Sequence, residues 1–300
     1  MTLNFNPIIK LPIDPPAPPA VDGRGTIPPG GAPTAPPKAA APPKAPAAPP
    51  PARTLDPLDI AQMVADVYGV HNVEYQHSHI ISTELSYLKD LKAHADKAKS
   101  RIQQINLEIG PMFVSAQDPI LRIQAIDLTK RWVDHAVVLN CPKVMVNQGQ
   151  PSQENKDVMI AALKACGDYA KSKGVKISME TRGGGGGRGR GAAGDAPAGP
   201  PSPPPTPAWV LLKEVIEKSQ TYSNCDIGGV GAANQQALHD AAKALLPTSS
   251  GQTHIKVSAN WDLATFVKFY EGLGYKGLYT IEVTGYQPQR WVYDVILANI

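Results

Sequence analysis

Four residues that are able to bind a metal ion stand near the ends of four successive strand-like segments. They are Glu180, Asp226, His254 and Glu282. The segments are short, rich in β-branched or aromatic residues and bounded by turn residues; they span residues 175–180, 220–226, 253–258 and 278–283. If these strands run parallel in a barrel, their carboxyl ends meet on the face that holds the active site. Three carboxylates and one imidazole suit Mn²⁺, Mg²⁺ or Co²⁺, and Zn²⁺ less well, so we expect one divalent ion.

Two cationic residues follow two of these positions at strand spacing. Lys256 comes two residues after His254, and Arg182 comes two residues after Glu180. Because side chains alternate along a strand, each cation should point to the same side as the residue before it. Lys256 would then hold an oxyanion or phosphate of the substrate, and Arg182 would clamp the substrate. An ion-paired or solvated role is the alternative for both.

A second group of polar residues lies earlier in the chain. Glu74 is followed by His77 and His79, and a His-x-His pattern invites a metal interpretation. Carboxylates at a matching spacing are missing, so this interpretation is weaker than the first.

Strand-like and helix-like segments alternate along the chain, which indicates βαβ units and a parallel sheet. Further strands are predicted over residues 71–76, 101–109 and 142–149. Helical periodicity covers residues 55–68, 85–98, 120–139, 156–173, 210–219, 235–246, 262–273 and 291–300. We therefore predict an α/β fold, a (β/α)8 TIM barrel whose first strand would come from residues 2–10. A barrel without that strand and an open doubly wound sheet are the alternatives; no GxGxxG motif supports the open sheet.

Two low-complexity segments interrupt this pattern. Proline and alanine fill residues 14–53, and glycine and proline fill residues 183–207. Such compositions bury too little apolar surface to offset the entropy of ordering. The predicted organisation is therefore residues 1–13 as the first strand, 14–53 as a disordered segment, and 54–300 as the barrel with an insertion at 183–207.

The glycine run RGGGGGRGRG, residues 182–191, is not a phosphate loop, because no GxxxxGK[ST] pattern leads into a helix. The run also contains three arginines, which is little positive charge for an RNA-binding tail. Its place after the fifth predicted strand favours an enlarged loop at the edge of the site.

Bulk composition excludes several classes of partner and location. There are 29 Lys and Arg against 26 Asp and Glu, a net charge of +3 that predicts no nucleic-acid partner. No apolar run approaches the ~20 residues of a membrane helix, and the first residues do not resemble a signal peptide. Three scattered cysteines imply no disulfide framework. We expect a cytoplasmic protein without a membrane partner.

Several motifs resemble one known superfamily. The stretch 121–149 (LRIQAIDLTKRWVDHAVVLNCPKVMVNQG), the stretch 165–183, and the endings YSNCDIGG, THIKVS and GYKGLYTIEV are similar to the xylose isomerase-like TIM barrels. That superfamily includes sugar phosphate isomerases and epimerases and the AP endonuclease family 2 domain. The resemblance covers residues 55–182 and 208–298. It implies that Glu180, Asp226, His254 and Glu282 are ligands of a divalent metal.

The chain also departs from the usual pattern of that superfamily. Ketose epimerases of the superfamily tend to carry a His and an Arg where this chain has Gly229 and Asn260. Because both normally contact sugar, a free ketose as substrate is in doubt. The endonuclease-type zinc cluster is incomplete, since His77, His79 and Glu108 are its only candidate remnants.

The sequence therefore predicts a metal-dependent isomerase or epimerase that acts on a small carbohydrate, a sugar phosphate or a keto-sugar through an enediolate. Glu180 and Glu282 would be the acid and base. The candidate substrate contacts are Lys256, Arg182, His77 and Glu108. A metal-dependent lyase or dehydratase, and a non-catalytic barrel used as a binding module, are the alternatives. The sugar, the metal and the formation of a homo-oligomer stay open.

Overall fold

The computed structural model describes residues 9–11, 54–181, 207–226, 235–256 and 263–282. Strands and helices alternate along the chain in the predicted order. The strands are β1 (Asn72–Gln76), β2 (Arg101–Leu107), β3 (Lys143–Val146), β4 (Lys176–Glu180), β5 (Tyr222–Asn224), β6 (Gln252–Lys256) and β7 (Leu278–Glu282). The helices are α1 (Ile60–Tyr68), α2 (Leu85–Lys97), α3 (Pro119–Val138), α4 (Lys156–Ser172), α5 (Ala208–Ser219), α6 (Gln235–Leu245) and α7 (Leu263–Gly272). Short 3-10 turns are η2 (Pro57–Asp59), η3 (His77–His79) and η4 (Leu246–Thr248).

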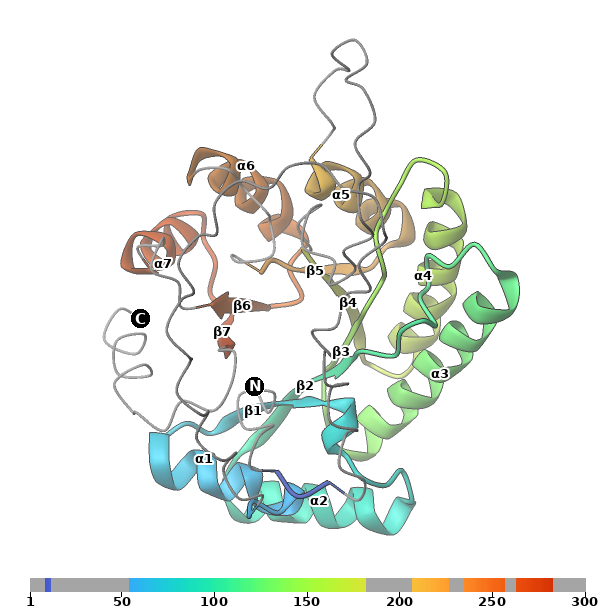
Figure 1. The fold of residues 1–300 in the computed structure, drawn as a ribbon. Helices are drawn as coiled ribbons and strands as arrows, with labels where there is room; N and C mark the ends of the chain where they lie inside the picture. The colour runs from blue at the N-terminus through green and yellow to red at the C-terminus, as the bar shows by residue number, and fades with distance from the viewer. Residues whose placement is uncertain (1–8, 12–53, 182–206, 227–234, 257–262, 283–300) are drawn as a thin grey trace, which may run out of the picture.

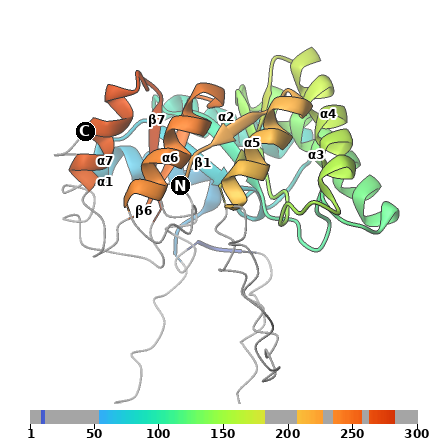
Figure 2. The same ribbon diagram turned by 90° about the horizontal axis from the view of Figure 1, so that it is seen from above.

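All paired strands are parallel. β1 to β5 form one sheet in chain order, and β6 pairs with β7. A parallel bridge between Ser223 and Ser249 joins β5 to the residues just before β6. The strands form an inner ring and the helices surround it (Figure 1), as the view turned by 90° also shows (Figure 2). The predicted parallel barrel is confirmed, and the open sheet, which would carry helices on both faces, is wrong.

Alternation along each strand separates two kinds of side chain. Ile105, Val144 and Ile177 are buried among apolar neighbours in the hydrophobic core. Helix residues such as Met159 and Leu163 of α4 complete that core. Burial of the strands and of one face of each helix explains why the strand sequences are rich in β-branched residues and the helix sequences are amphipathic.

The other strand positions carry polar side chains, which we call the polar interior. Its members are buried and come from five strands; they are Gln104, Asn106, Ser178, Asn224, Gln252 and Thr280. They bond to one another: Gln104 donates to Asn106 over 3.0 Å, and Gln252 donates to Thr280 over 2.8 Å. Branched apolar residues dominate the usual barrel interior, so this one depends more on hydrogen bonds.

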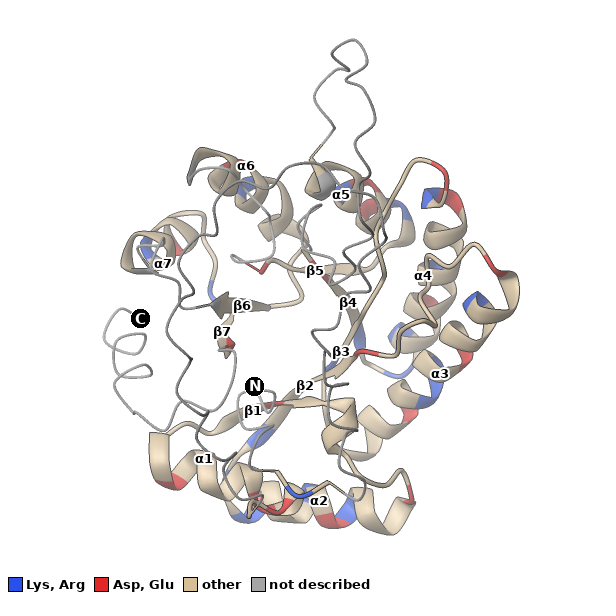
Figure 3. Cartoon of the chain, viewed as in Figure 1, with Lys and Arg blue, Asp and Glu red and all other residues tan. Residues whose placement is uncertain are grey.

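Charged side chains of both signs are interleaved along the outer helices (Figure 3). Lys164 and Asp168 pair within α4 at 2.9 Å, and Lys156 of α4 pairs with Glu214 of α5 at 3.0 Å. Exposed pairs of this kind add little stability. Within the described residues, no helix is both long and apolar enough to cross a membrane.

Some predicted segments lie outside the described residues. These are residues 1–8 of the proposed first strand, the Pro/Ala-rich segment, most of the Gly/Pro-rich segment and the helix predicted at 291–300. Ile9 is described; it is buried and forms a parallel bridge with Leu55. The origin of an eighth strand therefore stays a prediction.

Candidate metal centre

Three of the four predicted ligands come together: Glu180 and Glu282 end β4 and β7, and His254 lies within β6. One ligand atom from each of Glu180, His254 and Glu282 lies within 4.8 Å of the other two. The Nδ1 atom of His254 is 2.9 Å from Oε1 of Glu180 and 3.3 Å from Oε2 of Glu282. Parallel strands place their carboxyl ends on one face, so these residues meet although 74 positions separate Glu180 from His254.

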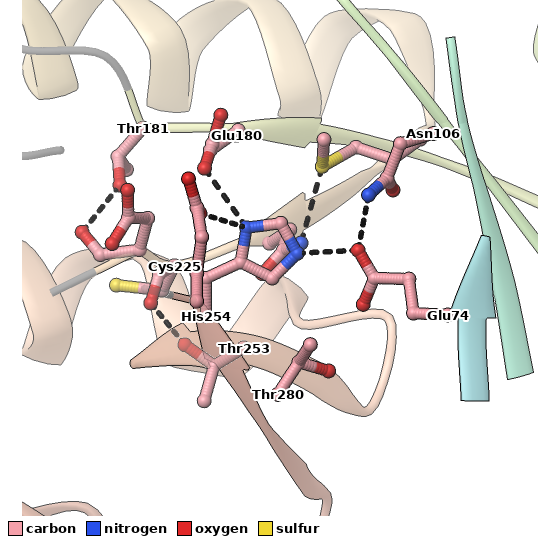
Figure 4. Close-up of polar contacts among 12 residues, drawn as sticks. Glu74, Asn106, Glu180, Thr181, Cys225, Thr253, His254 and Thr280 are labelled. Atoms are coloured by element: carbon pink, nitrogen blue, oxygen red, sulfur yellow. Dashed lines mark hydrogen bonds and ion pairs between the residues drawn. The ribbon is translucent and has the colours of Figure 1, made fainter. Parts of the chain in front are cut away.

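The backbone of β6 fixes the direction of the imidazole. The hydroxyl of Thr253 donates to the carbonyl of Cys225 beside β5, which ties β6 to its neighbour (Figure 4). His254 is the next residue and therefore points to the opposite side, into the barrel, where it is fully buried. The ring thus lies at the base of the site.

A third carboxylate, Glu74 of β1, meets the opposite nitrogen of the same ring. Its Oε1 atom is 2.7 Å from Nε2 of His254 (Figure 4). The side-chain amide of Asn106 donates to Oε1 as well, and that of Gln252 donates to Oε2. Glu74 is 2% exposed, so these polar contacts replace water around its charge.

The structure places Glu74 apart from the two histidines that follow it in the sequence. His77 and His79 lie in η3, beyond the end of β1, whereas Glu74 points into the polar interior. Within the described residues, these three form no metal-type cluster. The signal in the sequence was a carboxylate in a short strand at a position that alternates with Val73 and Tyr75.

The charges of this cluster shift its titration. Burial alone would raise the pKa of Glu74, but the charge and hydrogen bond of His254 outweigh it and lower the pKa to about 2. Burial alone would lower the pKa of His254. The negative charge of Glu74 and the hydrogen bonds with the three glutamates outweigh burial, so the pKa of His254 is raised well above its usual value. Three carboxylates around one imidazole therefore attract positive charge strongly.

Asp226, the fourth predicted ligand, follows β5 and is fully buried. Among the described residues, the group of ligand atoms within 4.8 Å contains three members, and Asp226 is not one of them. Its backbone carbonyl accepts a hydrogen bond from the hydroxyl of Thr181 at 2.8 Å. Its role as a ligand stays a prediction.

The fold of the chain resembles that of known barrels. Residues 64–191 match the model of the xylose isomerase-like TIM barrel family. The match confirms the family resemblance noted in the sequence. No curated protein sequence matches the chain.

Solved structures share the xylose isomerase-like fold at low sequence identity. D-Psicose 3-epimerase from Clostridium cellulolyticum H10, with D-tagatose, aligns with a TM-score of 0.60 and 11% identity over 75% of this chain and 78% of its own. A xylose isomerase domain protein from Planctomyces limnophilus aligns with a TM-score of 0.58 and 13% sequence identity, over 80% of this chain and 90% of its own. L-Ribulose 3-epimerase aligns with a TM-score of 0.58 and 12% sequence identity, over 77% of this chain and 76% of its own. These similarities establish the fold.

The remaining candidate residues are placed as follows. The Nδ1 atom of His77 lies 3.2 Å from the backbone N of Glu108 and also 3.2 Å from the carbonyl O of Asn106. The carboxylate of Glu108 accepts a hydrogen bond from the side chain of Asn147. Both predicted substrate contacts thus lie near the carboxyl ends of β1 and β2. The side chain of Lys256, at the end of β6, and the whole of Arg182 lie outside the described part of the structure.

The donor set at this face fits a divalent ion. Two carboxylate oxygens and one imidazole nitrogen approach one another at this face. Oxygen and nitrogen donors of this kind hold Mn²⁺, Mg²⁺ or Co²⁺. Glu180, His254 and Glu282 would hold the ion, with Asp226 as the predicted fourth ligand.

Proposed function

We propose that this chain is a divalent-metal-dependent sugar isomerase or epimerase. The observation that carries the proposal is the convergence of Glu180, His254 and Glu282 at the carboxyl-terminal face of the barrel. Supporting it, two structures with the same fold are a D-psicose 3-epimerase and an L-ribulose 3-epimerase. Fold alone does not define a reaction, so the proposal depends on the chemistry of the three side chains.

The three carboxylates near His254 differ in access to the outside. The side chains of Glu180 and Glu282 are 9% and 15% exposed, whereas that of Glu74 is 2% exposed. A substrate that approaches the carboxyl-terminal face reaches the first two and not the third. Glu180 and Glu282 are therefore the pair that can exchange a proton with a sugar.

The proposed reaction begins with removal of the proton on a carbon next to the sugar carbonyl. One of Glu180 and Glu282 takes this proton, and the other returns one to the enediolate. A bound divalent ion would supply positive charge that stabilises the developing oxyanion and would orient the two substrate oxygens. β4 and β7 carry the two glutamates on strands that are not neighbours, so each can act from its own side of the substrate.

Elemental analysis of the purified protein is the first test, and about one Mn, Mg or Co per chain is expected. The protein is then incubated in D₂O with a panel of ketoses, keto-sugars and sugar phosphates. An isomerase or epimerase incorporates deuterium at the carbon next to the carbonyl and keeps the sugar intact. Exchange followed by loss of water would replace the proposal with a lyase or dehydratase. Bound metal without exchange on any sugar would replace it with a binding module.

A further inference from the structure

Glu74 is a buried carboxyl side chain that points into the polar interior, and the proposed reaction does not use it. It lies on β1, 180 positions before His254, and it is too buried to meet a substrate. It also stands outside the group of three ligand atoms. Its contacts nevertheless end on the ring of a predicted ligand.

The carboxylate of Glu74 is held from several sides. Asn106 donates to one oxygen and Gln252 donates to the other. These donors are themselves fixed, because Gln104 donates to Asn106 at 3.0 Å and Gln252 also donates to Thr280 at 2.8 Å. The direction of the Glu74 carboxylate is therefore set by donors from two other strands, β2 and β6.

The contact with Glu74 decides which nitrogen of His254 is available to an ion. A neutral imidazole has one N–H group and one lone pair, on different nitrogens. The Glu74 carboxylate, 2.7 Å from Nε2, can only accept, and an ion held between Glu180 and Glu282 would need the lone pair of Nδ1, so in the neutral ring the N–H group would belong to Nε2. The lone pair then lies on Nδ1, which is the nitrogen that faces Glu180 and Glu282.

We propose that Glu74 is a positioning residue that holds the His254 ring with Nε2–H toward β1 and presents Nδ1 to the metal. This inference rests on the metal site of the proposed function. Carboxylates in this outer position orient ligand histidines and raise their basicity, and their removal typically weakens metal binding by about 10–100-fold.

The first test compares Mn²⁺ dissociation constants, measured by calorimetry, for the full-length protein and for Glu74→Gln. This variant keeps the shape of the side chain but can donate to Nε2, which favours the wrong tautomer. Binding is expected to weaken by about 10–100-fold. Ser178→Ala is the matched control, because Ser178 is equally buried in the polar interior and has no described contact with His254. The control should keep the wild-type constant, and melting temperatures of all three proteins monitor folding.

A second measurement uses the wild type alone and stays decisive if Glu74→Gln does not fold. Nitrogen-15 spectra of the histidine-labelled, Mg²⁺-loaded protein report which ring nitrogen carries the proton, with His254→Asn used for assignment. The expected result is a protonated Nε2 and a metal-bound Nδ1. The reverse tautomer, or equal Mn²⁺ affinity in Glu74→Gln and wild type, overturns the role of Glu74. Failure of the wild type to bind Mn²⁺ instead overturns the metal centre itself.

Discussion

The hydroxyl of Thr181 donates a 2.8 Å hydrogen bond to the backbone carbonyl of Asp226. This bond joins the carboxyl ends of β4 and β5 and holds the predicted fourth ligand beside the strand of Glu180. Thr181→Val removes the hydroxyl at nearly constant volume and leaves a buried carbonyl without this donor. We expect a loss of about 1–3 kcal/mol in the free energy of unfolding, measured in urea, together with weaker Mn²⁺ binding.

A matched control separates the two effects of Thr181→Val. Thr129 is similarly buried, and its hydroxyl donates to the carbonyl of Ala125 at 2.7 Å within α3. Thr129→Val should leave Mn²⁺ binding unchanged and should lower stability less, because the carbonyl of Ala125 keeps a backbone N–H donor within the helix. Equal metal affinity in both variants would mean that the Thr181 bond serves stability alone.

Substitution of the ligands tests the metal centre directly. His254→Ala removes the nitrogen donor, and Asp226→Ala removes the predicted fourth ligand, so each should abolish Mn²⁺ binding. Equilibrium dialysis followed by elemental analysis measures the occupancy. Retention of the ion by Asp226→Ala alone would restrict the site to the three converging residues, and retention by both variants would refute the site.

The two accessible glutamates should be more than ligands. Glu180→Gln and Glu282→Gln each keep an oxygen for coordination but remove the basic group. At raised Mn²⁺ concentration the metal should remain bound, while turnover falls by the ~10²–10⁴-fold typical of a lost general acid or base. For an epimerase that uses two bases, one variant should still wash deuterium into the substrate from one face. Near-normal exchange in both would move the acid and base elsewhere, with Lys256 the first alternative.

His77 should titrate below its ordinary range. Burial lowers its pKa from 6.5, and its ring lies edge-on to Trp132, with ring centroids 5.8 Å apart. Because the folded state disfavours the charged form, the stability from neutral His77 is complete above pH 6.5 and is lost as the pH falls through the lowered pKa. Proton NMR of the histidine rings measures this titration. In His77→Gln the decline of melting temperature toward acid pH should be shallower, and a wild-type midpoint at or above 6.5 would contradict the assignment.

Gly277 permits a close approach between the starts of β6 and β7. A Cβ atom there would lie 2.5 Å from the carbonyl O of Gly251, which also accepts the backbone N–H of Leu278 at 3.0 Å. Gly277→Ala should therefore cost about 1–3 kcal/mol of stability, as overpacking does. Gly272→Ala, at the end of α7 with no heavy atom within 4 Å, should instead gain up to about 1 kcal/mol. Urea unfolding of both variants checks these opposite signs.

The strands were predictable because local residue types define them. Residues 175–180 and 278–283 were predicted as strands from their β-branched content and flanking glycines, and β4 and β7 occupy Lys176–Glu180 and Leu278–Glu282. The helix predicted at 120–139 is α3, whose start is fixed by Asp118 accepting from the backbone N–H of Ile120. The meeting of Glu180, His254 and Glu282 followed from parallel order alone.

The contact between Glu74 and His254 could not be predicted in the same way. It depends on how β1 and β6 are placed across the barrel, and neither strand pairs with the other in the described sheet. Strand alternation reports that Glu74 shares a face with Gln76, but it does not report which distant strand lies opposite. The distance of the Asp226 carboxylate from the other ligands depends equally on loop geometry after β5, which strand patterns do not encode.

The polar interior has a consequence for how the chain can be divided. Glu74 belongs to the first strand of the described sheet, yet two of its partners, Gln252 and His254, come from β6. A fragment that ended after β5 would bring a carboxylate into the middle of a half-barrel without those partners. We therefore expect that closure of the ring is the step at which the carboxylate of the N-terminal half gains its partners from β6. Separately expressed fragments of residues 54–226 and 235–300 should become stable only when mixed.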